Sequence, residues 1–347
     1  MATAELKATP IEAALAAIDK AVEDSSRDVL AATLRGLMIG YDRQWGNSPW
    51  KAVEVEQSFH LPIINPETGR DLKIFTHSGR TDGIVEYDDR VYLLEHKTAS
   101  EDVSDPSAPY WRRLAIDAQV SGYVLANWQC GRKLDGTLYD VIRKPSIRPK
   151  KIAAKDAQIV VKTQQYCGYD VSPATVNGII DGSITEENGE LYELRLVADI
   201  SERPDWYFQR RSIPRMDAEL VEYAQELCDT AREIRDAQLK HRHYRNPNAC
   251  MMYNSPCEYL GLCSGHDVPE SDNWRKRQSG HVDVEGDPLK ILSHSRMSTF
   301  RTCRRKHFYR YELGIEPNKE EKEALYFGKL FHEALAAWWF PNQLEAQ

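Results

Sequence analysis

The sequence predicts a mixed α/β (α+β) fold, in which a mixed β-sheet is flanked by helices. Strand-like segments with alternating or continuous apolar residues lie at about 52–61, 73–77, 82–87, 91–97 and 138–142. Segments with helical periodicity precede and follow them. Hydrophobic residues make up 41% and charged residues 28% of the chain, as in ordinary globular proteins. Strands enclosed by helices in this order indicate a layered architecture.

The first elements follow from local patterns. Residues 11–23 and 26–44 carry apolar side chains at the spacing of amphipathic helices. The segment Asn65-Pro66-Glu67-Thr68-Gly69 is a turn between strands. The polar pair Asp88-Asp89 joins the next two strands as a β-hairpin. A long helix is expected at 109–130.

The later part of the chain is less regular. The strand at 138–142 ends before Pro145, and residues 146–184 show no clear period. Residues 246–290 are rich in Pro, Gly, Asn, Cys and Asp, which predicts a loop. The remaining expected elements are helices at 185–202, 216–240, 295–310 and 322–339, with a strand at 207–211.

Composition narrows the class of protein. No apolar run approaches the ~20 residues of a membrane span, and the N-terminus lacks the apolar region of a signal peptide. We therefore expect a cytoplasmic protein of a bacterium or phage-infected host, without a membrane partner. The net charge of −8 is unusual for a protein that coats nucleic acid, yet it allows an enzyme with a local basic channel. Seven cysteines in such a chain do not predict disulfides.

Asp82 and the segment Glu95-His96-Lys97 form the most informative pattern. Side chains two apart on a strand point to one face, so Glu95 and Lys97 are expected to project together. Across the hairpin, Asp82 is expected beside Glu95. Two carboxylates and an ammonium at one point indicate a divalent-metal site. Solvated charges on an edge strand are the alternative, but residues 91–94 predict a buried strand whose terminal charges need compensation.

Gln119 and Tyr123 share one face of the predicted helix because they are four residues apart. An amide and a phenol at this spacing could bind a phosphate or a base edge, or flank the metal site. A helix-surface pair without a function is the alternative interpretation.

Cys250, Cys257 and Cys263 lie within fourteen residues of predicted loop. Thiolates at this density indicate a soft metal, either zinc or an iron–sulfur cluster. The tight spacing of zinc knuckles is absent, which favours the cluster over Zn²⁺. Cys303, among basic and aromatic residues, is the candidate fourth ligand.

Gly328 and His332 are four residues apart on the last predicted helix. This spacing predicts a close-packed helix face next to an imidazole. A histidine with an ordinary structural role is the alternative.

Together these motifs resemble the RecB-like branch of the PD-(D/E)xK nuclease superfamily, which includes phage exonucleases. The resemblance covers nearly the whole chain and is weakest over 146–245. The matching pieces are Gly328-x3-His332, Gly79-x2-Asp82, Glu95-x-Lys97, Gln119-x3-Tyr123 and the cysteines 303, 250, 257 and 263.

The resemblance implies a restriction-endonuclease-like core with a Cys-ligated cluster lobe. His332, Asp82 and Glu95 would bind Mg²⁺ or Mn²⁺, and the backbone carbonyl of His96 would be a further ligand. Lys97 would position the attacking water and stabilise the charge that develops at phosphorus.

The remaining motif residues have implied roles as well. Gln119 and Tyr123 would contact DNA or support the site. Cys303 would join the three-cysteine loop in holding a [4Fe–4S] cluster, in a structural role.

The order of the motifs departs from that of the relatives, in which the last two helices of this chain come first. We therefore expect a circular permutation, with residues 1–264 as nuclease core, 265–290 as linker and 291–347 as the family's N-terminal segment. It predicts that residues near 1–10 and 341–347 lie close together. A truncated tandem that pairs with a second molecule by swapping is the alternative, and a monomer is favoured.

The implied function is a metal-dependent DNA exonuclease of phage recombination or repair. A helicase or a single-strand annealing protein is its expected partner. The alternatives are a catalytically inactive iron–sulfur DNA-binding module, a subunit of a helicase–nuclease complex, and a zinc-stabilised scaffold. Retention of Asp82, Glu95, Lys97 and His332 argues against an inactive site.

Overall fold

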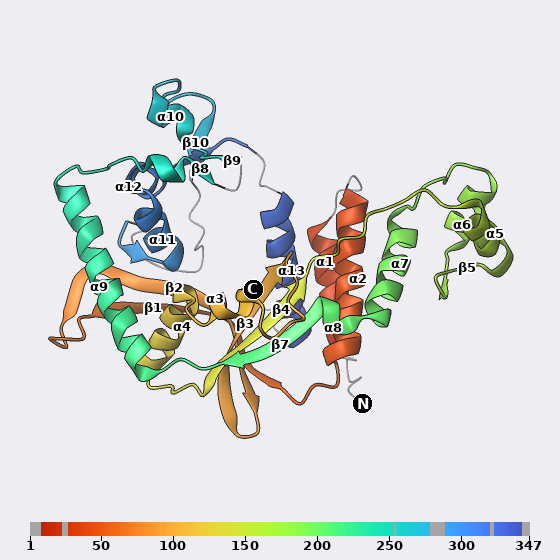
Figure 1. The fold of residues 1–347 in the computed structure, drawn as a ribbon, viewed down its shortest axis with the longest axis horizontal. Coiled ribbons are helices and arrows are strands. Elements are labelled where there is room, and N and C mark those ends of the chain that lie inside the picture. Colours follow the sequence, from red (N-terminus) through yellow and green to blue (C-terminus); the bar gives the residue numbers. More distant parts are fainter. Residues whose placement is uncertain (1–7, 23–26, 253–254, 278–288, 320–322, 342–347) are drawn as a thin grey trace, which may run out of the picture.

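A mixed β-sheet forms the centre of the chain in a computed structural model, which describes residues 8–22, 27–252, 255–277, 289–319 and 323–341 (Figure 1). The strand order is β1-β2-β3-β4-β7, and β11 pairs with β2 outside this path. The β3–β4 and β2–β11 pairs are parallel and the other pairs are antiparallel. The predicted mixed sheet is confirmed. Its strands are β1 (Lys51–Ile64), β2 (Asp71–Tyr87), β3 (Arg90–Ala99), β4 (Gly136–Arg143), β7 (Phe208–Ile213) and β11 (Ile291–Leu292).

Helices cover both faces of this sheet. On one face, α1, α2, α7 and α13 pack on strand residues such as Leu94 and Ile142. On the other, α3, α4 and α9 pack on residues such as Leu93 and Val141. The alternation of Leu93 and Leu94 between two cores is the period of a strand buried on both sides. These helices are α1 (Pro10–Ala21), α2 (Asp28–Trp45), α3 (Pro109–Leu114), α4 (Ala118–Gln129), α7 (Gly189–Glu202), α9 (Asp217–Leu239) and α13 (Glu323–Trp339).

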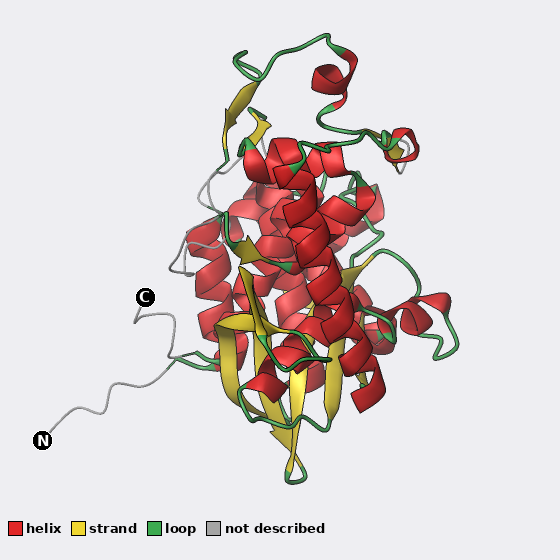
Figure 2. Cartoon of the chain, turned by 90° about the vertical axis from the view of Figure 1, so that its left-hand side faces the viewer, coloured by secondary structure: helices red, strands yellow, loops and turns green. Residues whose placement is uncertain are grey.

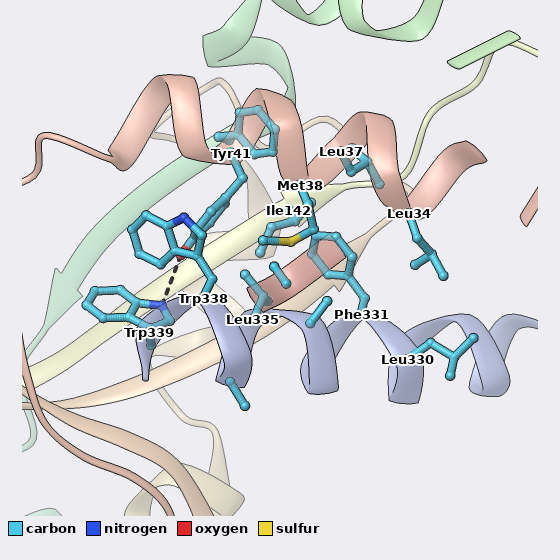
Figure 3. Close-up of a cluster of buried hydrophobic side chains, with 14 of the residues drawn as sticks. Leu34, Leu37, Met38, Tyr41, Ile142, Leu330, Phe331, Leu335, Trp338 and Trp339 are labelled. Atoms are coloured by element: carbon cyan, nitrogen blue, oxygen red, sulfur yellow. Dashed lines mark hydrogen bonds between the residues drawn. The ribbon is translucent and has the colours of Figure 1, made fainter. Parts of the chain in front are cut away.

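Helix α13 packs against α1 and α2, although most of the chain separates them in sequence. Trp338 Nε1 donates to Asp42 Oδ1 at 2.8 Å, and Trp339 Nε1 donates to the Tyr41 hydroxyl at 3.1 Å. Figure 3 shows Phe331 and Leu335 of α13 facing the apolar side chains of α2. The C-terminal segment is therefore part of the central core.

Three predicted elements have different boundaries. The two strands expected at 73–77 and 82–87 are one continuous strand, β2. The helix expected at 109–130 is interrupted after Leu114, and α4 starts anew with Asp117 as its N-cap. The helix expected at 295–310 breaks at Cys303, between α11 (His294–Thr302) and α12 (Arg304–His307). A π-helical turn, Phe308–Glu312, follows α12.

Residues 146–184, which showed no clear period, form a small lobe with its own apolar core. Buried Glu187 holds this lobe, because it accepts hydrogen bonds from the Tyr166 hydroxyl at 2.7 Å and from Arg195. The lobe stands to one side of the sheet in Figure 1. Its elements are α5 (Ala154–Thr163), β5 (Gln165–Tyr166), β6 (Tyr169–Asp170) and α6 (Pro173–Ile180); α7 follows, and the short α8 (Pro204–Tyr207) leads into β7.

The segment predicted as loop, 246–290, contains short elements in its described part. Figures 1 and 2 show the described residues of 246–277 at the opposite end of the molecule from the central sheet. In this segment, β10 pairs with β12 of the C-terminal segment, joining Trp274 to Pro317. The elements are a 3₁₀ turn (Pro247–Ala249), β8 (Met251–Met252), β9 (Ser255–Pro256), α10 (Leu260–Ser264) and β10 (Trp274–Lys276), with β12 at Ile315–Pro317.

Two further expectations concern the distance between the chain ends and membrane-spanning helices. The expected proximity of residues 1–10 and 341–347 falls mostly outside the described residues. None of the helices in the described ranges is long and apolar enough to cross a membrane.

Candidate active site where β2, β3 and α13 meet

Asp82 and Glu95 occupy the end of the β2–β3 ladder. The pair Gly83–Leu94 is the last of the register, so Asp82 and Glu95 follow it on either side. The backbone N–H of His96 donates to Asp82 Oδ2 at 2.7 Å. The hairpin thus joins the two carboxylate-bearing strands through a direct contact.

Lys97 lies on the same face as Glu95, as the strand period predicts. Its Nζ is 2.7 Å from Glu95 Oε1 and 3.3 Å from Asp117 Oδ2. It also donates to Gln119 Oε1 at 3.0 Å. The ammonium is therefore held by three oxygen atoms and has little freedom to move.

Gln119 and Tyr123 line up on α4, and Gln119 Nε2 donates to the Tyr123 hydroxyl at 2.8 Å. Asp117 caps helix α4 by accepting from Gln119 N. Because Asp117 also pairs with Lys97, the helix begins close to this lysine. The amide therefore links the catalytic lysine candidate to the phenol. A functional role for the pair stays a prediction, but the two side chains do adjoin the site.

His332 reaches the hairpin from α13. Its Nδ1 lies 3.5 Å from Asp82 Oδ1. The contact forms within one chain, so no second molecule is needed to complete the group. An added Cβ at Gly328 would meet no atom within 4 Å among the described residues. The expected close-packed face at Gly328 is therefore wrong, because this part of α13 has open space beside it.

The electrostatics of the group follow from burial. Burial and the nearby Asp82 raise the pKa of Glu95 to about 8. Burial acts in the same direction on Asp82, but His332 and His96 outweigh it and lower the pKa of Asp82 to about 2. The pKa of His332 is raised because Asp82 outweighs the effect of burial. Glu95 and Asp117 raise the pKa of Lys97 in the same way.

A hard divalent cation needs several oxygen donors around one point. Within the described ranges, no group of three or more His, Cys, Asp or Glu side chains is arranged to hold a metal ion. In this arrangement, Asp82 pairs with His332 and Glu95 pairs with Lys97. Glu95 Oε2, however, is buried and has no hydrogen-bond partner among the described residues. A buried, unpaired carboxylate oxygen beside a second carboxylate suits Mg²⁺ or Mn²⁺, so the residues fit such an ion.

Sequence patterns missed three residues around the site. Asp117 pairs with Lys97, and an aspartate two residues before Gln119 was the available signal for a helix cap. Glu56 lies on β1 between the partners of Gly83 and Thr81, opposite Asp82. Asp140 on β4 is fully buried, and its position within an apolar strand was a signal.

A hollow of about 350 Å³ opens between α11 and the start of α4. Ala118 of its lining follows Asp117, the partner of Lys97, so the hollow lies near this ion pair. Arg301 brings a positive charge to its lining, and this guanidinium also pairs with Glu226 at 3.2 Å; burial lowers the pKa of His294, which favours its neutral imidazole. The lining residues are Ala118, His294, Met297, Ser298, Arg301 and Thr302.

The predicted cluster cysteines gather around Cys263. Burial raises the pKa of the Cys263 thiol, against the effect of Arg305. The other three thiols of the set raise it further, which places them in its neighbourhood. Cys257 N also donates to Cys250 O at 2.8 Å. The four side chains are thus brought to one region, without the geometry of a metal site.

Comparison with known proteins adds one finding. The family model described as PD-(D/E)XK nuclease superfamily matches residues 291–347. This matched segment contains His332 and Cys303, whereas Asp82 and Glu95 lie outside it. No curated protein and no solved structure matches the chain. The structure joins the matched segment to the hairpin through the contact between His332 and Asp82.

Proposed function

We propose that this chain is a metal-dependent nuclease that hydrolyses phosphodiester bonds in DNA. The observation that carries the proposal is the meeting of Asp82, Glu95 and Lys97 with His332. The hairpin supplies the acidic and basic groups, and the histidine comes from the segment that is similar to a nuclease superfamily.

In the proposed mechanism Asp82, Glu95 and His332, with the backbone carbonyl of His96, would hold Mg²⁺ or Mn²⁺. The bound ion would polarise the phosphate and make water a better nucleophile. His332 would bind a cation only through a neutral imidazole nitrogen, so metal binding would release its proton to the solvent.

Lys97 would act on the attacking water and on the phosphate in the proposed mechanism. Its ammonium, fixed by Glu95, Asp117 and Gln119, would orient the attacking water and offset negative charge at phosphorus. The water oxygen bonds to phosphorus as the bond to the leaving oxygen breaks. The water gives up a proton, and the leaving oxygen gains one.

The substrate strand would lie beside these groups. The hollow between α11 and α4 lies near the Lys97–Asp117 pair, and the guanidinium of Arg301 and the imidazole N–H of His294 would donate to a phosphate backbone there. Gln119 and Tyr123 would support the site from the same helix.

The test is DNA degradation by Lys97→Ala and Asp82→Asn variants with Mg²⁺ or Mn²⁺. Each variant should lose about 10²-fold or more in rate, because each removes a charge from the reacting centre. Lys155→Ala changes an exposed lysine of the lobe and should cut at the wild-type rate. Wild-type activity in Lys97→Ala would overturn the assignment. DNA binding without cleavage by the wild type would support the inactive-module alternative.

The exonuclease mode and the role in phage recombination or repair are finer proposals. They rest on the resemblance to the RecB-like branch, as does the expected helicase or annealing partner. Linear DNA with free ends should be degraded, whereas closed circles and end-blocked duplexes should persist. Cleavage of closed circles at the same rate would contradict the exonuclease mode.

We also propose that Cys250, Cys257, Cys263 and Cys303 hold a [4Fe–4S] cluster. The gathering of the other thiols around Cys263 supports this, since thiolates are the usual ligands of such clusters. Protein purified without oxygen should be coloured and contain iron and sulfide. Cys303→Ser should lose both, while Cys130→Ser, at an exposed cysteine elsewhere, should keep them. Colourless protein that contains zinc would favour the scaffold alternative.

The order of the chain is the last part of the proposal. Residues 291–347 would be a permuted N-terminal segment that packs on the core of residues 1–264, with 265–290 as linker. The contact of His332 with Asp82 inside one chain supports this arrangement. A monomeric mass for the active protein is expected, and activity confined to a dimer would favour the swapped tandem.

A further inference from the structure

His96 lies between Glu95 and Lys97 on β3 and also contacts Asp82 of β2. Its backbone N–H donates to Asp82 at 2.7 Å, while its neighbours Glu95 and Lys97 face the opposite side of the strand. The His96 ring is buried and points into the core beside Trp339. The position of this ring therefore sets the position of a backbone group that contacts Asp82.

Asp140 meets that ring from the neighbouring strand. His96 and Asp140 are register partners of the parallel β3–β4 pair, and Asp140 Oδ2 lies 3.2 Å from His96 Nδ1. Asp140 is completely buried. A carboxylate in such a place costs stability unless charged and polar groups surround it.

Arg210 and Tyr41 are the groups that surround it. Arg210 Nε lies 3.2 Å from Asp140 Oδ1, and the Tyr41 hydroxyl donates to Asp140 Oδ2. Arg210 also donates to the Tyr41 oxygen at 2.7 Å. Each member of the group thus contacts the other two.

Aromatic rings fix this group in place. The guanidinium of Arg210 lies over the rings of Tyr41, Trp45 and Trp339, at 5.4, 4.3 and 5.1 Å from their centroids. Trp339 Nε1 donates to the Tyr41 hydroxyl, as the dashed line in Figure 3 shows. Trp339 belongs to α13, the helix that carries His332. The group therefore connects the sheet, α2 and α13 directly behind the site.

We propose that Asp140, held by Arg210 and Tyr41, is a positioning residue of the active site. It fixes the His96 ring and, through the His96 backbone, both the N–H that holds Asp82 and the carbonyl that would bind the cation. The inference rests on the proposed function, and it adds residues to which neither the sequence motifs nor the family match assigns a role. Residues behind metal ligands commonly change metal affinity by 10- to 100-fold when removed.

A purely structural role is the competing explanation, and the chain contains a matched control for it. In the lobe, Tyr166 donates to buried Glu187 at 2.7 Å, and Arg195 pairs with the same carboxylate. This second group likewise places a tyrosine hydroxyl and an arginine on one buried carboxylate. It lies in a separate small core, away from the hairpin.

The test compares Tyr41→Phe with Tyr166→Phe. Each variant loses one hydroxyl that donates to a buried carboxylate, so both should lose thermal stability; Tyr41→Phe should lose more, because the Tyr41 hydroxyl also accepts from Arg210 and Trp339. Mn²⁺ affinity, measured by calorimetry on the folded proteins, should fall by about tenfold or more in Tyr41→Phe only. Raising the Mn²⁺ concentration should restore the nuclease rate of Tyr41→Phe, whereas it should not restore that of Lys97→Ala.

Other outcomes separate this inference from the proposed function. The wild type should bind Mn²⁺, and the Asp82→Asn variant should not. If this holds and Tyr41→Phe binds Mn²⁺ as the wild type does, the positioning role is wrong and the nuclease proposal stands. If the wild type binds no Mn²⁺, both are wrong. Asp140→Asn provides a second variant, and it should weaken Mn²⁺ binding at least as much as Tyr41→Phe.

Discussion

Glu95 shows how one residue combines the demands of folding and chemistry. Its carboxylate is buried at the end of a strand, with one oxygen on Lys97 and the other without a hydrogen-bond partner in the described residues. Such an arrangement costs stability in a folded protein and is usually retained for a function. The unpaired oxygen of Glu95 therefore suits the proposed metal site, whereas it does not stabilise the core around it.

Another single residue, His77, is expected to make the folded protein less stable in acid. Burial, with a contribution from His294, lowers the pKa of His77 from its ordinary 6.5 to about 4. The unfolded chain therefore binds this proton more tightly, and the stabilising effect is lost as the pH falls from about 6.5 to about 4. The full effect is on the order of 3 kcal/mol, from 1.36 kcal/mol for each pH unit between the two values.

The measurement is the free energy of unfolding in urea at several pH values in this window. His77→Gln should lose less stability on acidification than the wild type, because it has no imidazole to protonate. His60→Gln, at an exposed position on β1, serves as the control and should follow the wild type. Equal acid sensitivity of the His77 variant and the wild type would contradict the prediction.

At the scale of elements, helix contacts distinguish two glycines. Gly40 of α2 faces α7 so closely that an added Cβ would lie 2.5 Å from Ile200 Cγ2. Gly328 of α13 would meet nothing within 4 Å among the described residues. One glycine permits a close helix approach, and the other is spaced away from its neighbours.

The corresponding variants should change stability in opposite directions. Gly40→Ala should destabilise the fold by about 1–3 kcal/mol, because α2 and α7 must move apart. Gly328→Ala should stabilise it by roughly 0.5–1 kcal/mol, because alanine favours the helix. Thermal and urea unfolding of the two variants provide the measurement. A stabilised Gly40→Ala would show that α2 and α7 are not in such close contact.

Breaks in elements were harder to predict than the elements themselves. The period of residues 109–130 continues across the break before Asp117, because apolar side chains on both pieces face the same core. The break itself depends on Asp117 accepting from Gln119 N and pairing with Lys97. The cap by Asp117 is a local signal for this boundary, whereas its ion pair with Lys97, twenty residues away, depends on the packed strand.

At the scale of the whole molecule, the C-terminal segment is bound to the rest by two separate cores. Phe331 and Leu335 are buried with α2 on one face of the sheet. Leu292 and Phe300 are buried with α9 in another cluster. Strand β11 adds backbone pairing with β2. Covalent connection through residues 278–288 is therefore expected to be dispensable for association.

A protease site inserted within 278–288 tests this expectation. After cleavage, the two fragments should elute together under native conditions at the mass of the intact chain and separate only in denaturant. The cut protein should also keep its Mn²⁺ affinity, because His332 and Asp82 remain in contact. Separation of the fragments under native conditions would show that the linker holds the segment in place.

Local patterns in the amino-acid sequence are sufficient to predict the mixed sheet, the β2–β3 hairpin and the shared face of Glu95 and Lys97. These follow from the period of a strand and the chemistry of a turn, which act over a few residues. Only the tertiary structure decided that His332 meets Asp82, that Asp117 completes the lysine site, and that Asp140 is held behind His96. Such contacts join distant segments through burial, and burial depends on how the whole chain packs.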